Sequence, residues 1–309
     1  MKIVFAGTTT NAVDVLRYLV QQGRHEIVAV ITREDALVGR NRVLTPSPVA
    51  AFAEAEGLLL IRANKITPEI DQQIAALDAD LGLVIAFGAL LRARTLAIAK
   101  HGWINIHFSL LPKWRGAAPV QRALMAGERE TGVSIFQLDV GMDTGRLHQQ
   151  VPVSIEPSDN AKTLLDRLTL ISISMLDETL SLIESGIAIT TDQIGEPTHA
   201  AKLDRSEVQI DWSKSANEIE HVIRGAYPEP VAWTNIDGQP FRILSARQAD
   251  ELSDGFGEES LGQVTISAGK AYVITGSGLL QLLEVQPASK PAMPATDWLR
   301  GKGGTVIFE

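Results

Sequence analysis

Two polar side chains interrupt an apolar, strand-like run at residues 103–108. Asn105 and His107 alternate there with apolar neighbours, and alternate residues of a strand point to the same face. An amide and an imidazole on one face can donate hydrogen bonds to negative charge that develops on a substrate oxygen. A half-exposed strand with one solvated face explains such a pair equally well, so the pair alone does not establish catalysis.

A loop containing prolines, a glycine and basic residues follows this run. Residues 109–123 read Ser-Leu-Leu-Pro-Lys-Trp-Arg-Gly-Ala-Ala-Pro-Val-Gln-Arg-Ala, and a solvated connector rarely needs the tryptophan that they include. Further along, Asp143 lies in a turn between two glycines. A carboxylate can assist proton transfer, whereas its common structural role in a loop is an Asx-turn. The spacing leaves open whether Asp143 meets His107.

Other well-known cofactor motifs are absent from the sequence. Gly7 ends the first apolar run, but the next residues lack the second and third glycines of a dinucleotide-binding fingerprint. The chain has no cysteine, and its six histidines show no metal-ligand spacing. We therefore expect neither NAD nor a metal ion in the site.

Strands that alternate with helical patterns must position these groups. We expect strands at residues 2–6, 27–31, 58–61, 83–87 and 103–108, with helices at 11–22 and 47–56 and a helical stretch that reaches residue 100. Two further strands, at 133–138 and 147–153, and a long helix at 161–185 complete this part. The pattern predicts an α/β fold with a doubly wound, mainly parallel, Rossmann-like sheet, whose ligand crevice lies at the carboxyl ends of the strands.

A second, smaller domain follows a polar linker. Beyond the linker we expect a helix at 216–224 and short strands at 232–236, 241–244, 262–266, 271–274 and 279–285. Turn residues separate these strands, which favours a small antiparallel β-barrel of OB-like type. The expected organisation is a first domain at 1–187, a linker at 188–207 and a second domain at 208–309.

The composition describes an ordinary folded protein of 309 residues, 45% hydrophobic and 21% charged. Its longest apolar run, residues 81–91, is shorter than the about 20 residues that cross a bilayer as a helix, so we expect no membrane partner. We expect a cytoplasmic protein, since the chain lacks cysteine and an apolar leader. A net charge of −9 repels polyanions at long range, so a nucleic-acid partner needs locally clustered bases.

Taken together, these motifs resemble those of the folate-dependent formyltransferases that act on methionyl-tRNA. The resemblance covers almost the whole chain and is therefore far more specific than Asn-x-His alone. It rests on Asn105-x-His107, Ser109-Leu110-Leu111-Pro112, Gly116-Ala117-Ala118-Pro119, Asp143, Phe5-Ala6-Gly7-Thr8, Leu44-Thr45-Pro46-Ser47-Pro48-Val49 and Ile210-Asp211-Trp212-Ser213.

The resemblance implies that 10-formyltetrahydrofolate, as cosubstrate, donates a formyl group to the methionine amine of initiator methionyl-tRNA for translation initiation. It assigns catalysis to Asn105, His107 and Asp143 and requires no metal. The Asn105 amide and a protonated His107 would donate to the oxyanion of the tetrahedral intermediate. Asp143 would orient His107, favour its charged form and assist proton transfer from the amine.

The resemblance also assigns binding residues. Folate would contact Ser109, Leu110, Leu111 and Pro112, with Phe87, Gly88 and Leu90 near its pterin. The segment 32–44 resembles an insertion loop that reaches the tRNA acceptor arm through Arg40 and Arg42, and Lys202 is a further tRNA-binding candidate. A solvated loop remains the alternative for that segment. We expect the protein to be a monomer.

Two other functions are compatible with parts of this pattern. A formyltransferase acting on a ribonucleotide or an amino sugar nucleotide shares Asn-x-His and the aspartate, although residues 116–119 and 210–213 favour tRNA. A noncatalytic tRNA-binding module could also use this scaffold, because a fold does not guarantee chemistry. The intact set of Asn105, His107 and Asp143 favours an enzyme.

Overall fold

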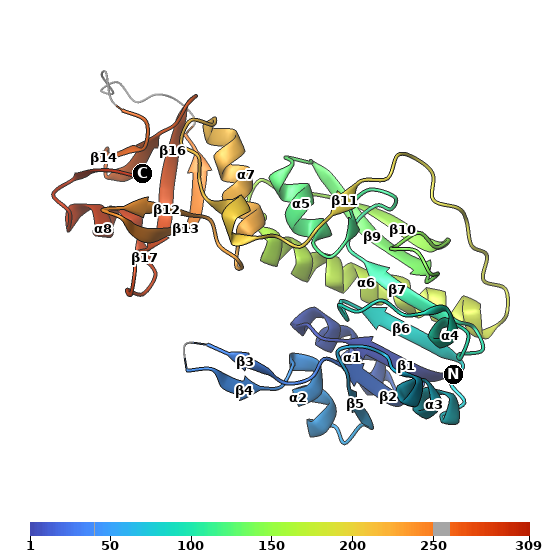
Figure 1. Cartoon of the computed structure of the whole chain (residues 1–309). Coiled ribbons are helices and arrows are strands. Elements are labelled where there is room, and N and C mark those ends of the chain that lie inside the picture. The colour runs from blue at the N-terminus through green and yellow to red at the C-terminus, as the bar shows by residue number, and fades with distance from the viewer. Residues whose placement is uncertain (40, 250–259) are drawn as a thin grey trace. The chain divides into compact units, whose positions relative to one another are not determined.

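The computed structural model describes residues 1–39, 41–249 and 260–309 (Figure 1). Its packing divides the chain into two compact units, which are described separately. The first unit contains Met1–Pro119, Glu130–Ser154 and Leu165–Ala201, and the second contains Val120–Arg129, Ile155–Leu164 and Lys202–Glu309. The domain boundaries expected from the sequence, at residues 187 and 208, remain a prediction.

A seven-stranded sheet forms the centre of the first unit, in the order β10-β9-β7-β6-β1-β2-β5 (Figure 1). Its parallel strands are β1 (Lys2–Gly7), β2 (Glu26–Thr32), β5 (Leu60–Arg62), β6 (Leu81–Ile85) and β7 (Trp103–His107). Strand β9 (Glu130–Gln137) runs antiparallel to both β7 and β10 (Leu147–Ser154). These pairings confirm the doubly wound, mainly parallel fold. Because the chain passes outward to β5 and returns to β6, the switch point lies between β1 and β6.

Helices cover both faces of this sheet, because its central strands are apolar on both sides. Within β1, Val4 and Ala6 pack in one cluster with Ile74, whereas the equally buried Ile3 and Phe5 point to the opposite face. Among the described helices, none is long and apolar enough to cross a membrane. The helices that contribute to this unit are α1 (Thr10–Gln22), α2 (Pro48–Ala55), α3 (Pro68–Ala76), α4 (Ala93–Leu96) and most of α6 (Ala161–Glu184).

Two segments after β5 differ from the sequence-based expectation. The expected strand at 83–87 ends at Ile85, and the helical stretch expected to reach residue 100 is reduced to α4. Ala86 and Gly88 have left-handed φ angles of 46° and 79°, which end the strand and keep residues 86–88 out of a helix. Helix α3 was not expected, although the Thr67 side chain caps its first turn.

A short hairpin occupies part of the segment that was expected to be a loop at 32–44. Strands β3 (Ala36–Val38) and β4 (Val43–Thr45) pair in antiparallel register. The insertion loop expected from the resemblance therefore includes a hairpin, since Val38 and Val43 favour extended backbone on both sides of the turn. Gly39, with φ of 74°, begins the turn between them.

A curled antiparallel sheet dominates the second unit. The main-chain N–H of Glu309 donates to the carbonyl of Asn235 at 3.0 Å, which joins the chain after β18 to β12 and confirms the predicted barrel-like fold. Phe241, Trp298 and Phe308 pack against one another in its core. The strands are β12 (Trp233–Ile236), β13 (Gln239–Gln248), β16 (Leu279–Gln286), β15 (Lys270–Ile274), β14 (Gln263–Ser267) and β18 (Thr305–Ile307), with β17 (Met293–Pro294) on β16. The helices are α5 (Pro119–Met125), η1 (Arg205–Val208), α7 (Ala216–Ala226) and α8 (Ala295–Arg300).

Gly82 of β6 lies directly against the indole of Trp103. A Cβ at this position would overlap the ring, which is fully buried and fixed by a 2.9 Å hydrogen bond from its Nε1 to the carbonyl of Thr95. We therefore expect Gly82→Ala to lower the free energy of unfolding by about 1–3 kcal/mol, the usual cost of overpacking. Chemical denaturation measures this loss. In the double variant with Trp103→Leu, the loss of unfolding free energy should be smaller than the sum of the losses in the two single variants. Additive losses would contradict the proposed overlap.

Candidate active site

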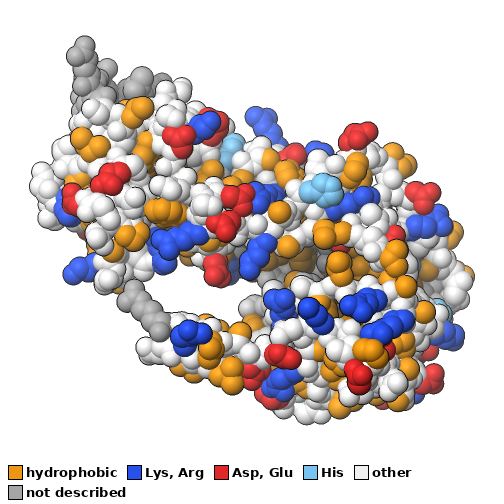
Figure 2. All heavy atoms as spheres, in the orientation of Figure 1, with side chains coloured by type: hydrophobic (Ala, Val, Ile, Leu, Met, Phe, Trp, Pro, Cys, Tyr) orange, Lys and Arg blue, Asp and Glu red, His pale blue; other side chains and the backbone are white. Residues whose placement is uncertain are grey.

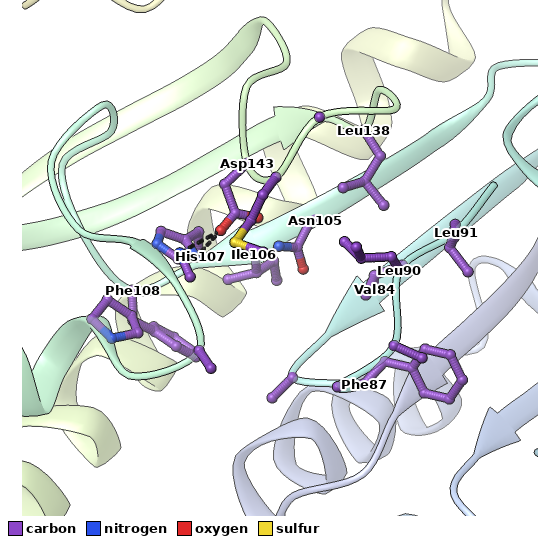
Figure 3. A pocket seen from close by; sticks show the side chains of 18 of the residues that line it. Val84, Phe87, Leu90, Leu91, Asn105, Ile106, His107, Phe108, Leu138 and Asp143 are labelled. Carbon is purple, nitrogen blue, oxygen red and sulfur yellow. Dashed lines mark hydrogen bonds and ion pairs between the residues drawn. The ribbon is translucent and has the colours of Figure 1, made fainter. Parts of the chain in front are cut away.

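A pocket opens at the carboxyl ends of β6 and β7, beside the switch point of the sheet (Figure 3). Its volume of about 420 Å³ lies within the range typical of small-molecule sites. In Figure 3, Asn105 lies beside the His107–Asp143 pair, and Leu90 and Phe87 lie further along the pocket. The three residues expected to be catalytic therefore line one cavity within the first unit.

The environment of His107 fixes which ring nitrogen carries the proton. Its Nε2 lies 2.8 Å from the main-chain oxygen of Trp114. Because a carbonyl only accepts, Nε2 must donate, and the neutral ring then has a lone pair on Nδ1. Nδ1 lies 3.8 Å from Oδ2 of Asp143. In the neutral tautomer, a lone pair therefore faces a carboxylate.

Burial and charge act on the pKa of His107 in opposite directions. Only 5% of the residue is exposed, and this burial lowers the pKa of the imidazole below its ordinary value. The carboxylate of Asp143 and the carbonyl of Trp114 oppose the shift by raising the pKa. Burial thus disfavours the protonated imidazole that the resemblance implies. Protonation of His107 in the reacting complex remains a prediction.

Main-chain groups of the Pro- and Gly-containing loop hold Asp143. The N–H of Gly116 donates to Oδ2 of Asp143 at 2.7 Å. Gly116 has a φ of 125°, and a Cβ there would lie 2.7 Å from the carbonyl oxygen of Ala200, so the position requires glycine. Asp143 itself has a left-handed φ of 54°. Trp114 and Gly116 were not predicted as partners of the catalytic pair, because their contribution is made by the backbone.

This geometry can hold one additional proton. Two acceptors, Nδ1 of His107 and Oδ2 of Asp143, face each other, so a proton taken up between them would remove their repulsion. The Asn105 amide lines the same pocket and supplies a neutral hydrogen-bond donor. A proton acceptor and a neutral hydrogen-bond donor in one pocket suit the formation and collapse of a tetrahedral intermediate.

The residues expected to bind folate fall into two groups. Phe87, Gly88 and Leu90 line the pocket. The run from Ser109 to Pro112 is not among its lining residues, and all but Leu110 are buried. The hydroxyl of Ser109 instead donates to the carbonyl of Lys113 at 2.6 Å, within the loop that follows β7 and supplies Gly116. A direct folate contact by this run remains a prediction.

A second hollow adjoins the pocket and carries basic side chains. The two hollows share the residues from Gly88 to Leu91. The second is also lined by Arg33, Lys65 and Arg92. An elongated ligand with an apolar ring and an anionic end could occupy both, since the cations would attract its carboxylates.

The residues expected to contact tRNA lie on exposed parts of the chain. Arg42 is exposed in the turn of the β3–β4 hairpin, and Arg40 lies outside the described residues. Figure 2 shows this hairpin with apolar side chains beside a basic one. Lys202, in the second unit, is also exposed, and its carbonyl accepts a bond from Arg122. The exposed apolar side chains of the hairpin are Leu37, Val38, Val43 and Leu44.

The sequence is similar to formyltransferases along nearly its entire length. Residues 1–180 match the family model of formyl transferase, and residues 202–303 match that of the formyl transferase C-terminal domain. The methionyl-tRNA formyltransferase of Leifsonia xyli subsp. xyli is 43% identical over 308 residues, with 100% of both chains covered. That of Clavibacter sepedonicus is 44% identical over 301 residues, with 97% of each chain covered.

Solved structures of lower identity share the fold. An N-formyltransferase from Helicobacter canadensis, in complex with folinic acid and dTDP-3-aminofucose, has a TM-score of 0.69 at 19% identity over 93% of this chain and all of its own. HypX from Aquifex aeolicus, in complex with tetrahydrofolic acid, has a TM-score of 0.66 at 16% identity over 97% of this chain and 47% of its own. At these identities the likeness establishes the fold alone.

Proposed function

Because the chain belongs to the methionyl-tRNA formyltransferase family, we propose that it transfers a formyl group from 10-formyltetrahydrofolate to the methionine amine of initiator methionyl-tRNA. The observation that carries this proposal is the convergence of Asn105, His107 and Asp143 on one pocket. Formylation of the charged initiator tRNA prepares it for translation initiation, which takes place in the cytoplasm.

The reaction replaces one carbon–nitrogen bond with another. The neutral methionine amine attacks the formyl carbon, and the carbonyl oxygen becomes an oxyanion. The Asn105 amide donates to that oxyanion, and preorganised donors of this kind lower the barrier because they need no reorientation during the reaction. Collapse of the intermediate breaks the bond between the formyl carbon and N10 of the folate. The products are formylmethionyl-tRNA and tetrahydrofolate.

One proton must move from the amine to N10 for these steps to balance. The His107–Asp143 pair accepts the proton when the amine attacks, because its two facing acceptors lie 3.8 Å apart. While the pair holds this proton, His107 is cationic and helps to stabilise the adjacent oxyanion. The pair then returns the proton to N10, which departs as a neutral nitrogen. No proton is gained or lost overall.

The two adjoining hollows suit the two ends of a folate, the pterin ring and the anionic glutamate. The pterin ring would occupy the apolar pocket near Phe87 and Leu90, and the glutamate carboxylates would extend toward Lys65 and Arg92. Opposite charge favours this orientation over the reverse. The run from Ser109 to Pro112 would stabilise the loop whose Gly116 binds Asp143, through the bond from Ser109 to Lys113.

The β3–β4 hairpin is the proposed contact of the first unit with the tRNA acceptor arm. Its exposed apolar side chains and the adjacent Arg42 have the amphipathic character of a surface that binds a macromolecule. Arg42 would contact a phosphate, and Arg40 and Lys202 are further candidates from the sequence. A monomeric enzyme is sufficient for this mode of binding.

We expect Arg42→Ala to raise the apparent KM for methionyl-tRNA and to leave the KM for folate unchanged. A lost phosphate contact should also reduce the slope of log affinity against log salt concentration by about one unit. Filter binding across a salt series measures this slope. Arg24→Ala is the matched control, because Arg24 precedes β2 at the opposite, amino-terminal edge of the sheet and pairs with Asp177. Identical slopes for Arg42→Ala and the parent would identify the turn as solvated.

A formylation assay separates this function from its alternatives. The purified protein is incubated with 10-formyltetrahydrofolate and, in parallel reactions, with methionyl-initiator tRNA, glycinamide ribonucleotide or an amino sugar nucleotide. Formylation of the tRNA alone is the expected result. Formylation of a nucleotide instead would indicate the rival enzyme class, and tRNA binding without formylation would indicate a noncatalytic module.

A further inference from the structure

Residues 190–200 form a connecting segment in the first unit, which we call the strap. It contacts the loop that follows β7 and the loop that follows β9, which contains Asp143. At its start, Thr191 and Leu147 exchange main-chain hydrogen bonds of 2.9 and 2.8 Å. At its end, β11 (His199–Ala200) pairs in parallel with β8 (Arg115–Gly116). The strap therefore bonds to the chain after Asp143 and to the loop that supplies Gly116.

Gln193 is the point at which the strap contacts the loop of Asp143. Its side-chain nitrogen donates to the carbonyls of Asp143 and Gly145, both at 2.8 Å. Its oxygen accepts from Nε and Nη2 of Arg115, at 3.2 and 2.6 Å. The carbonyls only accept and the guanidinium only donates, so these partners require a carboxamide in this one orientation. Its neighbours Asp192 and Ile194 are exposed, whereas Gln193 is half-buried.

Thr198 makes the corresponding contact with the loop beside His107. Its hydroxyl accepts a 2.8 Å hydrogen bond from the main-chain N–H of Trp114. The carbonyl of the same Trp114 is the group that accepts the proton of His107 Nε2. Thr198 thus acts on His107 through a single intervening residue.

Both residues held by the strap have an unfavourable backbone conformation. Asp143 has a φ of 54° and Trp114 a φ of 62°, in the left-handed region that costs a non-glycine residue about 1–2 kcal/mol. Such conformations persist only where surrounding contacts impose them. The contacts made by Gln193 and Thr198 are among those that do so.

We propose that Gln193 and Thr198 are positioning residues, which set the separation and orientation of His107 and Asp143 from the strap. The proposal rests on the catalytic roles assigned to this pair above. Neither strap residue is among those that line the pocket, so each acts through the backbone of a residue it bonds. Misplacement of a catalytic group by a fraction of an ångström lowers turnover without a comparable effect on binding.

Kinetics of full-length variants test the part of Gln193. We expect Gln193→Ala to lower kcat about 10- to 100-fold while both KM values change less than about twofold. Gln193→Glu keeps the size and the Arg115 contact but presents two acceptors to two carbonyls, so its loss should be at least as large. Ile194→Ala, at a 90% exposed neighbour, should match the parent. Full activity of Gln193→Glu would overturn the proposal, because the carbonyl contacts would then be dispensable.

Thr198 offers a conservative rescue. Thr198→Val keeps the shape without the acceptor and should lower kcat about fivefold, the effect of one neutral hydrogen bond. Thr198→Ser retains a hydroxyl and should restore most of the activity. Equal rates for the valine and serine variants would count against the role of Thr198.

The pKa of His107, measured by NMR of its imidazole nitrogens, provides a readout that needs no substrate. The carboxylate of Asp143 raises this pKa, so its displacement in Gln193→Ala should lower the pKa further. The resonance is assigned by its loss in His107→Gln. A parent protein that formylates no tRNA would contradict the proposed function. An unchanged His107 pKa together with an unchanged kcat in Gln193→Ala would contradict the positioning role of Gln193.

Discussion

Asn105→Ala is expected to lower kcat about 10²- to 10³-fold, the loss typical of one oxyanion-hole donor. Asn105 is half-buried in β7 and lines the pocket beside His107, where the proposed role of its amide is to donate to the oxyanion. Because the oxyanion forms only during the reaction, loss of this donor should change folate binding and the thermal unfolding midpoint little. Single-turnover rates with the preformed folate complex measure the chemical step directly.

An isosteric variant separates the donor from the shape of the side chain. Asn105→Asp keeps the volume of Asn105 but replaces the N–H donor with a second acceptor, which would repel the oxyanion. Its loss should equal or exceed that of Asn105→Ala. Parent-like single-turnover rates in either variant would remove Asn105 from the mechanism.

Hydrophobic periodicity was sufficient to predict most of the fold. β1, β2 and α1 lie within one residue of their expected bounds, because each has a continuous apolar run or an apolar stripe at helical spacing. The segment from Ala86 to Arg92 could not be predicted in this way. Its conformation depends on left-handed residues at 86 and 88, and these turn the chain so that Phe87 and Leu90 reach the pocket.

Prediction of the candidate site was limited to groups that act through side chains. Period-two spacing places Asn105 and His107 on one face of β7, and both line the pocket with Asp143. The backbone partners of the pair, Trp114 and Gly116, carry no side-chain signal for these roles, because any residue has a carbonyl and an N–H. Gln193 acts through its side chain but was not predicted either, because its position beside Asp143 depends on the folding of a chain in which the two residues lie 50 positions apart.

Asp143→Asn is expected to lower kcat about 10²- to 10⁴-fold, the contribution of general acid–base catalysis, with small changes in both KM values. The N–H of Gly116 requires an acceptor at the position of Oδ2, so the amide oxygen of the new residue should take this position and also face Nδ1 of His107. A neutral amide oxygen stabilises a proton on Nδ1 less than a carboxylate does. The altered pair should therefore accept the proton of the attacking amine less readily. Asp192→Asn, which removes an equal charge from an exposed carboxylate paired with Arg146, should leave kcat unchanged.

The pH dependence of kcat tests the same proton step, because it shows whether the unprotonated or the protonated pair is the active form. In the parent, kcat should fall as the pH falls through the pKa of the His107–Asp143 pair, because a pair that already holds a proton cannot take another. Burial lowers the pKa of His107 and the charge of Asp143 raises it, so Asp143→Asn should lower this pKa and move the acid limb to lower pH. Any pH dependence of kcat that is due to ionisation of the substrate amine would be the same in both proteins. A parent kcat that instead falls as the pH rises through this pKa would make the imidazolium of His107 the active form, and the uptake of the amine proton by the pair would be wrong.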